Sequence, residues 1–204
     1  NIMNKVRFTN KDILSAERNF RINLINSISG IKSVNLISTI SQSGVSNLAI
    51  FSSVIHLGSN PPLLGFVLRP ETRRLSDTMQ NVREMKYFTI NQISSSQVKP
   101  AHQTSKKIDT NKSEFDEFGF KELFINNIKV PFVEDSKIKI GLNFLDQLKI
   151  KKNNTSLVIG EIDFIEINKS IIKNSGHIDL EKSNSIGVSG LDNYYYLTNL
   201  INLD

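Results

Sequence analysis

The chain has 204 residues, a formal net charge of +5 and no cysteine. Without cysteine it can hold neither disulfides nor thiolate metal sites, and it has no thiol nucleophile. Hydrophobic residues make up 39% of the chain and charged residues 22%, which is typical of a soluble globular protein rather than a disordered one. The sequence has no apolar run of membrane-spanning length and no signal-peptide core, so we expect a cytoplasmic protein with no membrane partner.

The basic residues are scattered along the chain in short clusters. A nucleic-acid interface needs basic residues gathered on one face and interleaved with exposed aromatic side chains. We therefore expect no nucleic-acid partner. The positive charge is better interpreted as a mildly basic surface that attracts anionic cofactors.

The first part of the chain is predicted to be helical. Thr9-Asn-Lys-Asp12 has the spacing of a capping box, so a short helix is predicted to begin there. Apolar residues from Phe20 to Ile28 recur at helical spacing, and Gly30 provides a stop. We expect one domain, residues 1–204, with a helical lead-in over about 9–30, a barrel core over about 33–172 and a tail over 173–204.

The rest of the chain is predicted to be rich in strands, because apolar and polar residues alternate. Ser41-Gln-Ser-Gly44 supplies a turn, Pro61-Pro62 marks a boundary, and Gly160 indicates a bulge in a long strand. The predicted strands cover 34–40, 45–50, 53–57, 63–68, 87–90, 124–128, 138–148 and 155–172, and the predicted helices cover 75–85, part of 94–113 and 114–119. Many antiparallel strands with a few helices predict a mainly β fold, a β-barrel with decorating helices.

Several kinds of active site are not supported by the sequence. The histidines His56, His102 and His177 are far apart and lack metal-ligand spacing, so no metal site is expected. The acidic residues over 114–117 are interpreted as a charged helical turn rather than an acid–base pair. No G-x-S-x-G, P-loop or G-x-G-x-x-G motif occurs. A self-contained hydrolase, NTPase or Rossmann dehydrogenase is therefore unsupported, and no catalytic side chain is predicted.

Two segments could together hold a phosphorylated, planar cofactor. In the first, Arg73 and Arg74 supply forked donors, and the residues over 76–78 begin a helix whose free N–H groups can face an anion. In the second, a strand places Asn47, Ala49 and Phe51 on one face, and small Ala49 would let a flat ring approach. From the residues alone, an exposed basic loop before a capped helix and polar residues in a strand-end turn remain equally open.

The order of the motifs resembles the flavin reductase-like family of the FMN-binding split-barrel fold, which includes flavoredoxins. Similarity covers about residues 20–197, with Ile50 and Ser76 replacing the family's proline and lysine. The matching segments are Leu36-Ile-Ser-Thr39, Ser43-Gly44, Asn47-Leu-Ala-Ile-Phe-Ser52, Asn60-Pro-Pro-Leu63 with Phe66, and Ser76-Asp-Thr-Met-Gln-Asn81.

The resemblance implies a split β-barrel of Greek-key antiparallel strands with a few helices. It also implies a set of FMN-binding residues. Thr78 with the pair Arg73 and Arg74 would hold the phosphate, and either arginine can supply the charge of the missing lysine. The implied cofactor-binding residues are Ser38, Thr39, Asn47, Leu48, Ala49, Ser52, Ser53, Arg73, Arg74 and Thr78.

The resemblance further implies an oxidoreductase that moves hydride from NADH or NADPH to FMN. The alternative is a flavoredoxin-like electron carrier or FMN-binding module without NAD(P)H oxidase activity, and a third reading is a relative that binds another cofactor or none. A homodimer with FMN near its interface is implied, with an electron acceptor or oxygenase as a further partner. His102 is placed either near the nicotinamide entrance or in a surface role.

Overall fold

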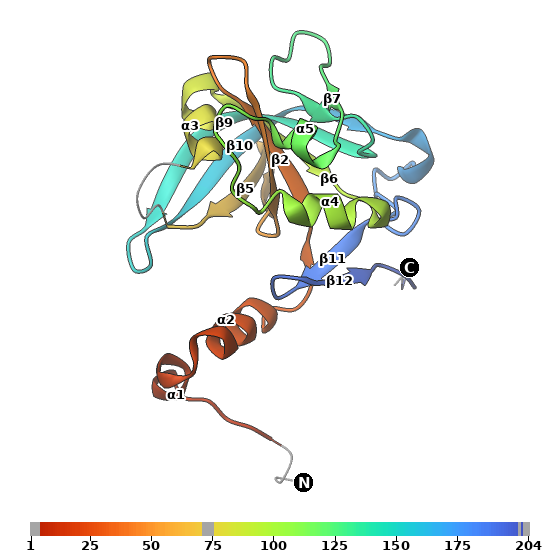
Figure 1. Ribbon diagram of the computed structural model, residues 1–204. Coiled ribbons are helices and arrows are strands. Elements are labelled where there is room, and N and C mark those ends of the chain that lie inside the picture. Colours follow the sequence, from red (N-terminus) through yellow and green to blue (C-terminus); the bar gives the residue numbers. More distant parts are fainter. Residues whose placement is uncertain (1–4, 71–75, 200, 202–204) are drawn as a thin grey trace.

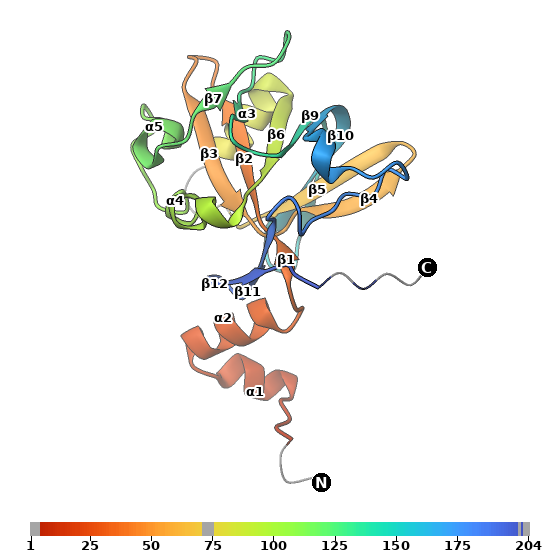
Figure 2. The same cartoon turned by 90° about the vertical axis from the view of Figure 1, so that its right-hand side faces the viewer.

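A computed structural model describes residues 5–70, 76–199 and 201 (Figure 1). A curled antiparallel sheet forms the body of the molecule, and helices cover part of it. The two N-terminal helices project away from this body, beyond the small sheet that carries the C-terminal strands (Figures 1 and 2). Arg73 and Arg74 lie outside the described residues.

The body is a seven-stranded sheet in the order β3-β2-β6-β9-β10-β5-β4, and each neighbouring pair is antiparallel. The predicted bulge is confirmed, because the register of β9 and β10 shifts between Ile159 and Gly160. Its strands are β2 (Asn35–Ile40), β3 (Ser46–Phe51), β4 (Ile55–Ser59), β5 (Pro62–Leu68), β6 (Tyr87–Gln92), β9 (Ile138–Ile150) and β10 (Thr155–Ile167). The predicted mainly β, antiparallel architecture is thus confirmed.

Two smaller sheets complete the β structure. One has the order β1-β11-β12, and the other pairs β7 with β8. Their bounds are β1 (Lys32–Ser33), β7 (Glu122–Leu123), β8 (Phe132–Val133), β11 (Ile186–Ser189) and β12 (Asn193–Tyr196). The last two strands lie in the segment that was predicted only as a tail.

Two predicted strands are wrong in whole or in part. Residues 124–128 form no strand, because the chain turns at Asn126, whose φ of 51° is left-handed, and then returns toward β8. The long strand predicted to reach Ile172 ends at Ile167, because the Asn168 side chain accepts the Ser170 N–H and begins a 3-10 turn.

The described helices are short. They are α1 (Asn10–Ser15), α2 (Arg18–Ser27), α3 (Asp77–Met85), α4 (Val98–Gln103) and α5 (Glu114–Phe118), with 3-10 turns at Ser95–Gln97 and Lys169–Ile171. The capping box at Thr9 is confirmed, since its side chain and that of Asp12 satisfy each other's backbone N–H groups. None of the helices in the described ranges is long and apolar enough to cross a membrane.

Two hydrophobic cores lie on opposite faces of β2. On one face, Ile37 packs with Phe66, Phe88 and α3, and the Phe66 ring lies 5.3 Å from the Phe88 ring. On the other face, Leu36 packs with residues of β3, α4, α5 and β11. Because successive side chains of a strand point to opposite faces, β2 contributes to both cores, and any polar residue on it belongs to one side or the other.

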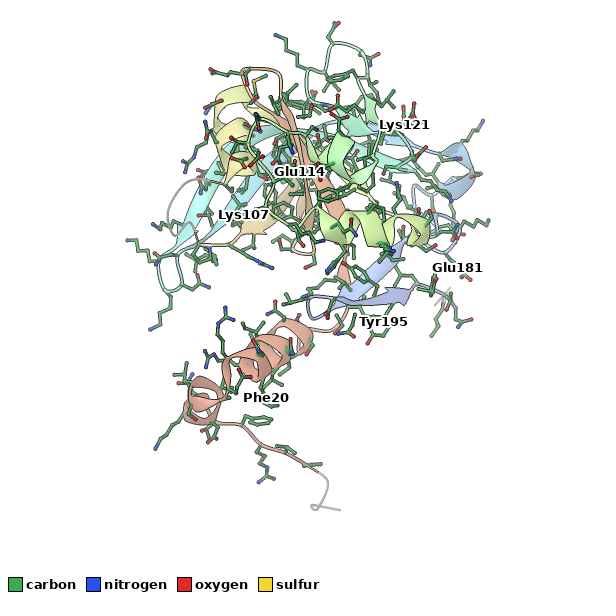
Figure 3. All side chains as sticks on the ribbon, in the orientation of Figure 1. Phe20, Lys107, Glu114, Lys121, Glu181 and Tyr195 are labelled. Carbon is green, nitrogen blue, oxygen red and sulfur yellow. The ribbon has the colours of Figure 1, made fainter. Side chains whose placement is uncertain are left out.

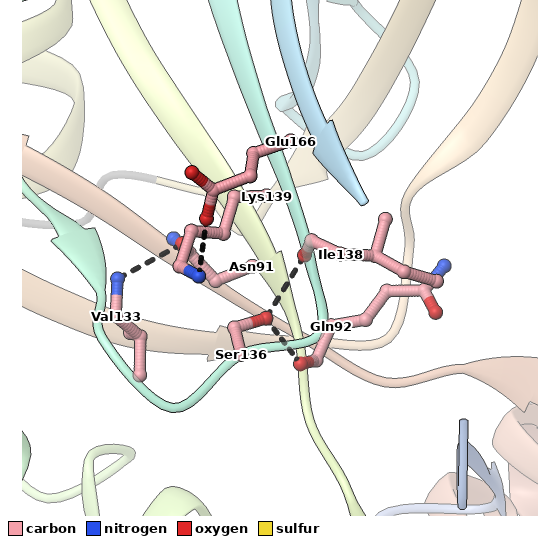
Figure 4. Close-up of polar contacts among 7 residues, drawn as sticks. All are labelled: Asn91, Gln92, Val133, Ser136, Ile138, Lys139 and Glu166. Atoms are coloured by element: carbon pink, nitrogen blue, oxygen red, sulfur yellow. Dashed lines mark hydrogen bonds and ion pairs between the residues drawn. The ribbon is translucent and has the colours of Figure 1, made fainter. Parts of the chain in front are cut away.

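A buried polar network fixes the junction of β6, β8 and β9 (Figure 4). The Asn91 carboxamide oxygen accepts the Val133 N–H at 3.0 Å, and the Ser136 hydroxyl lies 2.7 and 2.9 Å from the carbonyls that end β6 and begin β9. The buried Lys139 Nζ lies 2.7 Å from Glu166 Oε1. Each of these groups has a hydrogen-bond or ion-pair partner, so the contacts hold the strands in place.

Candidate functional site

The edge strand β3, its neighbour β2 and the helix α3 meet through two side-chain hydrogen bonds. Asn47 Nδ2 on β3 donates to Thr78 Oγ1 at 3.2 Å, and Asn81 Nδ2 on α3 donates to Thr39 Oγ1 at 3.1 Å. Thr78 lies in the first turn of α3, so the beginning of this helix is fixed beside the outermost strand. The two segments singled out in the sequence are therefore neighbours.

The predicted binding residues of β2 and β3 divide between two faces. Thr39, Asn47 and Ala49 lie on the face that α3 covers, whereas Ser38 and Leu48 point to the opposite face. Ser38 is fully buried, and its hydroxyl has no hydrogen-bond partner among the residues that the structure describes. A single ligand surface on the α3 side can therefore use side chains of the first group only.

The free edge of β3 is held by Glu114, which sequence analysis did not select. Its Oε2 accepts the Leu48 N–H at 3.0 Å, and the side chain is buried at the start of α5 (Figure 3). Burial raises the pKa of this carboxyl, and the negative charge of Asp77 raises it further. Sequence analysis interpreted the acidic residues over 114–117 as a charged helical turn, and no local pattern links Glu114 to the Leu48 N–H 66 residues away.

The start of α3 is built as a capped helix terminus. Ser76 is the N-cap residue, and its Oγ accepts the Met79 N–H at 3.2 Å. The Ser76 carbonyl accepts the Gln80 N–H at 3.0 Å. The residue that replaces the family's lysine therefore has a structural role of its own. The predicted phosphate residues Arg73 and Arg74 lie outside the described residues, so the anion site remains a prediction.

The two serines after β3 differ in their contacts. The Ser53 hydroxyl lies 3.1 Å from the Val67 carbonyl oxygen, to which it donates, and 3.0 Å from the Val67 nitrogen, whose proton it accepts. Both bonds connect the end of β3 to β5, so this hydroxyl is committed to closing the barrel. Ser52 is half-buried and shows no side-chain hydrogen bond within the described residues. It stays a predicted binding residue, and Ser53 has a structural explanation.

Among the histidines that the structure describes, His102 is the one whose ring makes a hydrogen bond. Its Nδ1 shares a hydrogen bond of 2.8 Å with the Tyr194 hydroxyl of β12, and α4, which carries it, packs against β3 and α5. Burial raises the pKa of Tyr194. His56 and His177 are exposed. In the described ranges, no three His, Cys, Asp or Glu side chains are placed to hold a metal ion.

Comparison with known proteins identifies the relatives of this arrangement. A family model described as the flavin reductase like domain matches residues 31–178. The solved structure of a putative flavin reductase with split barrel domain from Shewanella frigidimarina NCIMB 400 is 36% identical, with a TM-score of 0.93 over 98% of this chain and 99% of that chain. The predicted split-barrel fold is therefore confirmed.

More distant structures share the fold. Nitrilotriacetate monooxygenase component B from Bacillus cereus is 19% identical, with a TM-score of 0.86 over 98% of each chain. Flavoredoxin of Desulfovibrio vulgaris (Miyazaki F) is also 19% identical, with a TM-score of 0.72 over 84% of this chain and 90% of that chain. Proteins with different names thus use the same barrel, and the function has to be argued from the site.

Proposed function

Since the chain belongs to the flavin reductase like family, we propose that it binds FMN and reduces it with hydride from NADH or NADPH. The observation that carries this proposal is the Asn47–Thr78 hydrogen bond. It joins an edge strand, against which a flat ring can lie, to a helix N-terminus, which favours a phosphate. A ligand with both parts suits this junction.

The residues at this junction fit such a ligand in size and chemistry. Ala49 is small and half-buried, and it lies on the α3 side of β3 between Asn47 and Phe51. Asn47 donates to Thr78 through its nitrogen, so its carboxamide oxygen is left to accept another hydrogen bond, and the Thr78 hydroxyl is left to donate one. We assign Thr39, Asn47, Ala49 and Ser52 to the ring and ribityl side.

The phosphate end is assigned to Thr78 with Arg73 or Arg74. Arginine suits this task because its planar fork binds phosphate oxygens in pairs and its charge is permanent. Ser38 and Leu48 point to the face opposite α3. Contacts between their side chains and FMN therefore stay predictions, because the ligand would have to extend to that face.

In this proposal the flavin, when bound, supplies the redox chemistry, since it accepts hydride from the nicotinamide. The protein's own residues bind the two ends of the cofactor and hold the edge strand in position. Glu114 contributes to the second task by fixing the Leu48 N–H. No side chain is needed as acid or base, so the site requires no catalytic dyad.

Two partners belong to the proposal. A second copy of the chain would lie near the flavin in a homodimer. An oxygenase or other electron acceptor would then use the reduced flavin, because one structural neighbour is named as component B of nitrilotriacetate monooxygenase. That name describes the neighbour, and for this chain an oxygenase remains a proposed partner.

A flavin titration followed by a nicotinamide assay tests the proposal. We expect FMN to bind and oxidation of NADH or NADPH to depend on added FMN. Stoichiometric FMN without turnover of either nicotinamide would contradict the reductase activity and favour the electron-carrier alternative. Absence of FMN and riboflavin binding would overturn the flavin site itself.

Substitutions at the start of α3 test the phosphate end. We expect Thr78→Val to raise the Kd for FMN about 3- to 10-fold, the effect of losing one hydrogen bond, and Arg74→Ala to weaken FMN more than riboflavin. Thr104→Val is the matched control, because its buried hydroxyl donates to the Ala101 carbonyl on α4. Equal weakening of FMN and riboflavin by Arg74→Ala would show that the arginine does not bind the phosphate.

A further inference from the structure

The N-terminal arm, defined as residues 5–31, touches the small sheet at its end, where Ile31 lies against Gly187, and its two helices extend away from the seven-stranded sheet. Neither α1 nor α2 contains a buried residue, and both views show them beyond β1, β11 and β12 (Figures 1 and 2). The arm nevertheless carries many apolar side chains, among them Phe20 (Figure 3) and Ile28, which is 73% exposed. The exposed apolar residues of the arm are Val6, Phe8, Leu14, Phe20, Ile25, Ile28 and Ile31.

The arm is shaped by local hydrogen bonds rather than by a core. Arg21 Nη1 donates to the carbonyls of Leu14 and Ala16, each at 3.0 Å, and so sets the corner between α1 and α2. Lys32 Nζ donates to the Asn26 carbonyl at 2.8 Å and fixes the base. Helices of 6 and 10 residues are shorter than the roughly 12–15 residues that an isolated helix needs in water. The arm therefore needs a packing surface that its own barrel does not supply.

A second uncovered apolar surface lies on the barrel. Leu157 on β10 lies opposite Val67 on β5 and Leu148 on β9, so these three side chains share one face of the sheet. Phe66 and Val158 point to the other face, into the core. We call the first the outer face; it comprises Ile55, Leu57, Val67, Leu148, Ile150 and Leu157. Leu148 is 50% exposed and Ile55 43% exposed.

No described helix covers the outer face. In the described ranges, α3 packs against β2, β3 and β6, while α4 and α5 pack against β3. Apolar patches of this kind on a folded protein commonly mark an interaction surface. The chain therefore carries two apolar surfaces, the arm and the outer face, and covers neither.

The total exposed area supports a partner of substantial size. The chain exposes 13227 Å², whereas a compact monomer of 23.0 kDa is expected to expose about 9,600 Å². Two chains together carry an excess of about 7,200 Å², which is more than the roughly 2,000–5,000 Å² that obligate homodimer interfaces bury in total. A small or transient contact would leave most of this area uncovered.

We propose that the arm of one copy packs on the outer face of a second copy, and that the second copy returns the same contact. Two-fold symmetry makes this exchange self-complementary, because each copy presents one arm and one outer face. The inference refines the homodimer in the proposed function and names its interface. Another protein or a membrane surface would cover the arm and leave the outer face exposed.

The oligomeric mass tests the exchange. We expect the wild-type chain to sediment at twice 23.0 kDa, and the double variant Phe20→Glu with Ile28→Glu to sediment as a monomer. Both side chains are exposed within one chain, so the monomer is expected to fold. Ser29→Glu, an exposed polar position on the same arm, is the matched control and is expected to stay dimeric. A monomeric wild type, or a double variant that stays dimeric, would overturn the proposal.

Cross-linking tests which surfaces meet. The natural chain has no cysteine, so Ile25→Cys on the arm and Leu148→Cys on the outer face can be placed in separate chains and joined by a short bismaleimide. We expect mixed dimers for this pair and none when Leu148→Cys is replaced by Lys121→Cys, an exposed site away from the outer face. Equal yields would contradict the assignment.

Two further readouts separate the alternatives. Arm-dependent binding of a monomeric wild type to anionic phospholipid vesicles would show that a membrane covers the arm. An FMN titration of the double variant shows whether the flavin site survives loss of the exchange. Flavin binding by a wild type that is monomeric would refute the exchange alone, and a dimer that binds no flavin would refute the flavin site alone.

Discussion

The two edge strands of the seven-stranded sheet, β3 and β4, differ in how far the rest of the chain covers them. At the β3 edge, the chain's own helices α3, α4 and α5 cover the strand, and polar groups such as Glu114 and Thr78 bind it. At the β4 edge, apolar side chains such as Ile55 and Leu57 remain uncovered. The β3 edge is covered by the same chain and is held by hydrogen bonds. The β4 edge exposes apolar surface that another molecule would have to cover.

This difference separates what each edge can contribute. Hydrogen bonds have fixed geometry and a modest net contribution of about 0.5–1.5 kcal/mol each, so the β3 edge is suited to positioning a ligand. Burial of apolar area contributes about 25 cal/mol per Å² without directional demands, so the β4 side is suited to association. The polar contacts of the β3 edge therefore suit ligand binding, and the apolar area beside β4 suits contact with a second copy.

The largest expected loss in the free energy of unfolding comes from a substitution in the enclosed core, which is compared with a matched substitution on the outer face. Phe66 is fully buried between the rings of Phe51 and Phe88. We expect Phe66→Ala to lower the free energy of unfolding by about 3–5 kcal/mol, because it removes apolar contacts and leaves a cavity. The loss, measured by urea unfolding, should not depend on protein concentration.

Leu148→Ala is the matched substitution on the other face of the same barrel. At protein concentrations low enough to dissociate a dimer, we expect a loss within about 0.5 kcal/mol, since half of this side chain is exposed. At higher concentrations the loss should grow, because the dimer then buries the residue. A small loss that stays constant across concentrations would remove the contrast between the two faces.

The next effect concerns the covered edge. Glu114→Ala leaves the buried Leu48 N–H without its acceptor, and we expect a loss of about 1–3 kcal/mol in the free energy of unfolding. Glu114→Gln keeps a carbonyl oxygen at the same reach and should cost less. If Ala and Gln cost the same, the hydrogen bond to the edge strand would not be what Glu114 contributes.

The raised pKa of Glu114 predicts how the stability of the chain changes with pH. Burial raises its pKa above the usual 4.5, so between that value and the higher folded value the folded chain keeps a proton that the unfolded chain has lost. Stability from this group is therefore complete below pH 4.5 and falls as the pH rises through the folded value. We expect the wild type to lose stability relative to Glu114→Gln across this window in urea unfolding. A constant difference would contradict the raised pKa.

Local patterns in the sequence predicted the strands of the main sheet, the capped start of α1 and the presence of α3. Such features depend on spacing within one segment, as in the alternation along β2 and the capping box at Thr9. The pairing of β1 with β11 was not predictable, because Lys32 lies opposite Val188 and neither segment alternates over a useful length. The turn at Asn126 was missed for a similar reason, since apolar neighbours on both sides suggested a strand.

The site was predictable as a list of segments but not as a set of contacts. The sequence placed Asn47 and Thr78 in two separate motifs, and only the fold brings them within hydrogen-bonding distance. Strand alternation could have separated Ser38 from Thr39, because adjacent residues face opposite cores. The roles of Ser53 and Glu114 depend on partners 14 and 66 residues away, which no local pattern encodes.

The smallest expected loss in the free energy of unfolding concerns the hydrogen bond that connects β12 to α4, one of the helices covering the β3 edge. Tyr194 on β12 holds His102 on α4 through a hydrogen bond of 2.8 Å, and α4 packs against β3. Tyr194→Phe keeps the ring and removes only the hydroxyl, so we expect a loss of about 0.5–1 kcal/mol in urea unfolding, at the low end because the pair is partly exposed. His102→Ala in the same background should then cost less than it does alone, since the two residues share one bond. Additive losses would mean that the C-terminal strands and α4 are stabilised independently. The polar edge would then be supported by α3 and α5 without help from the segment beyond residue 178.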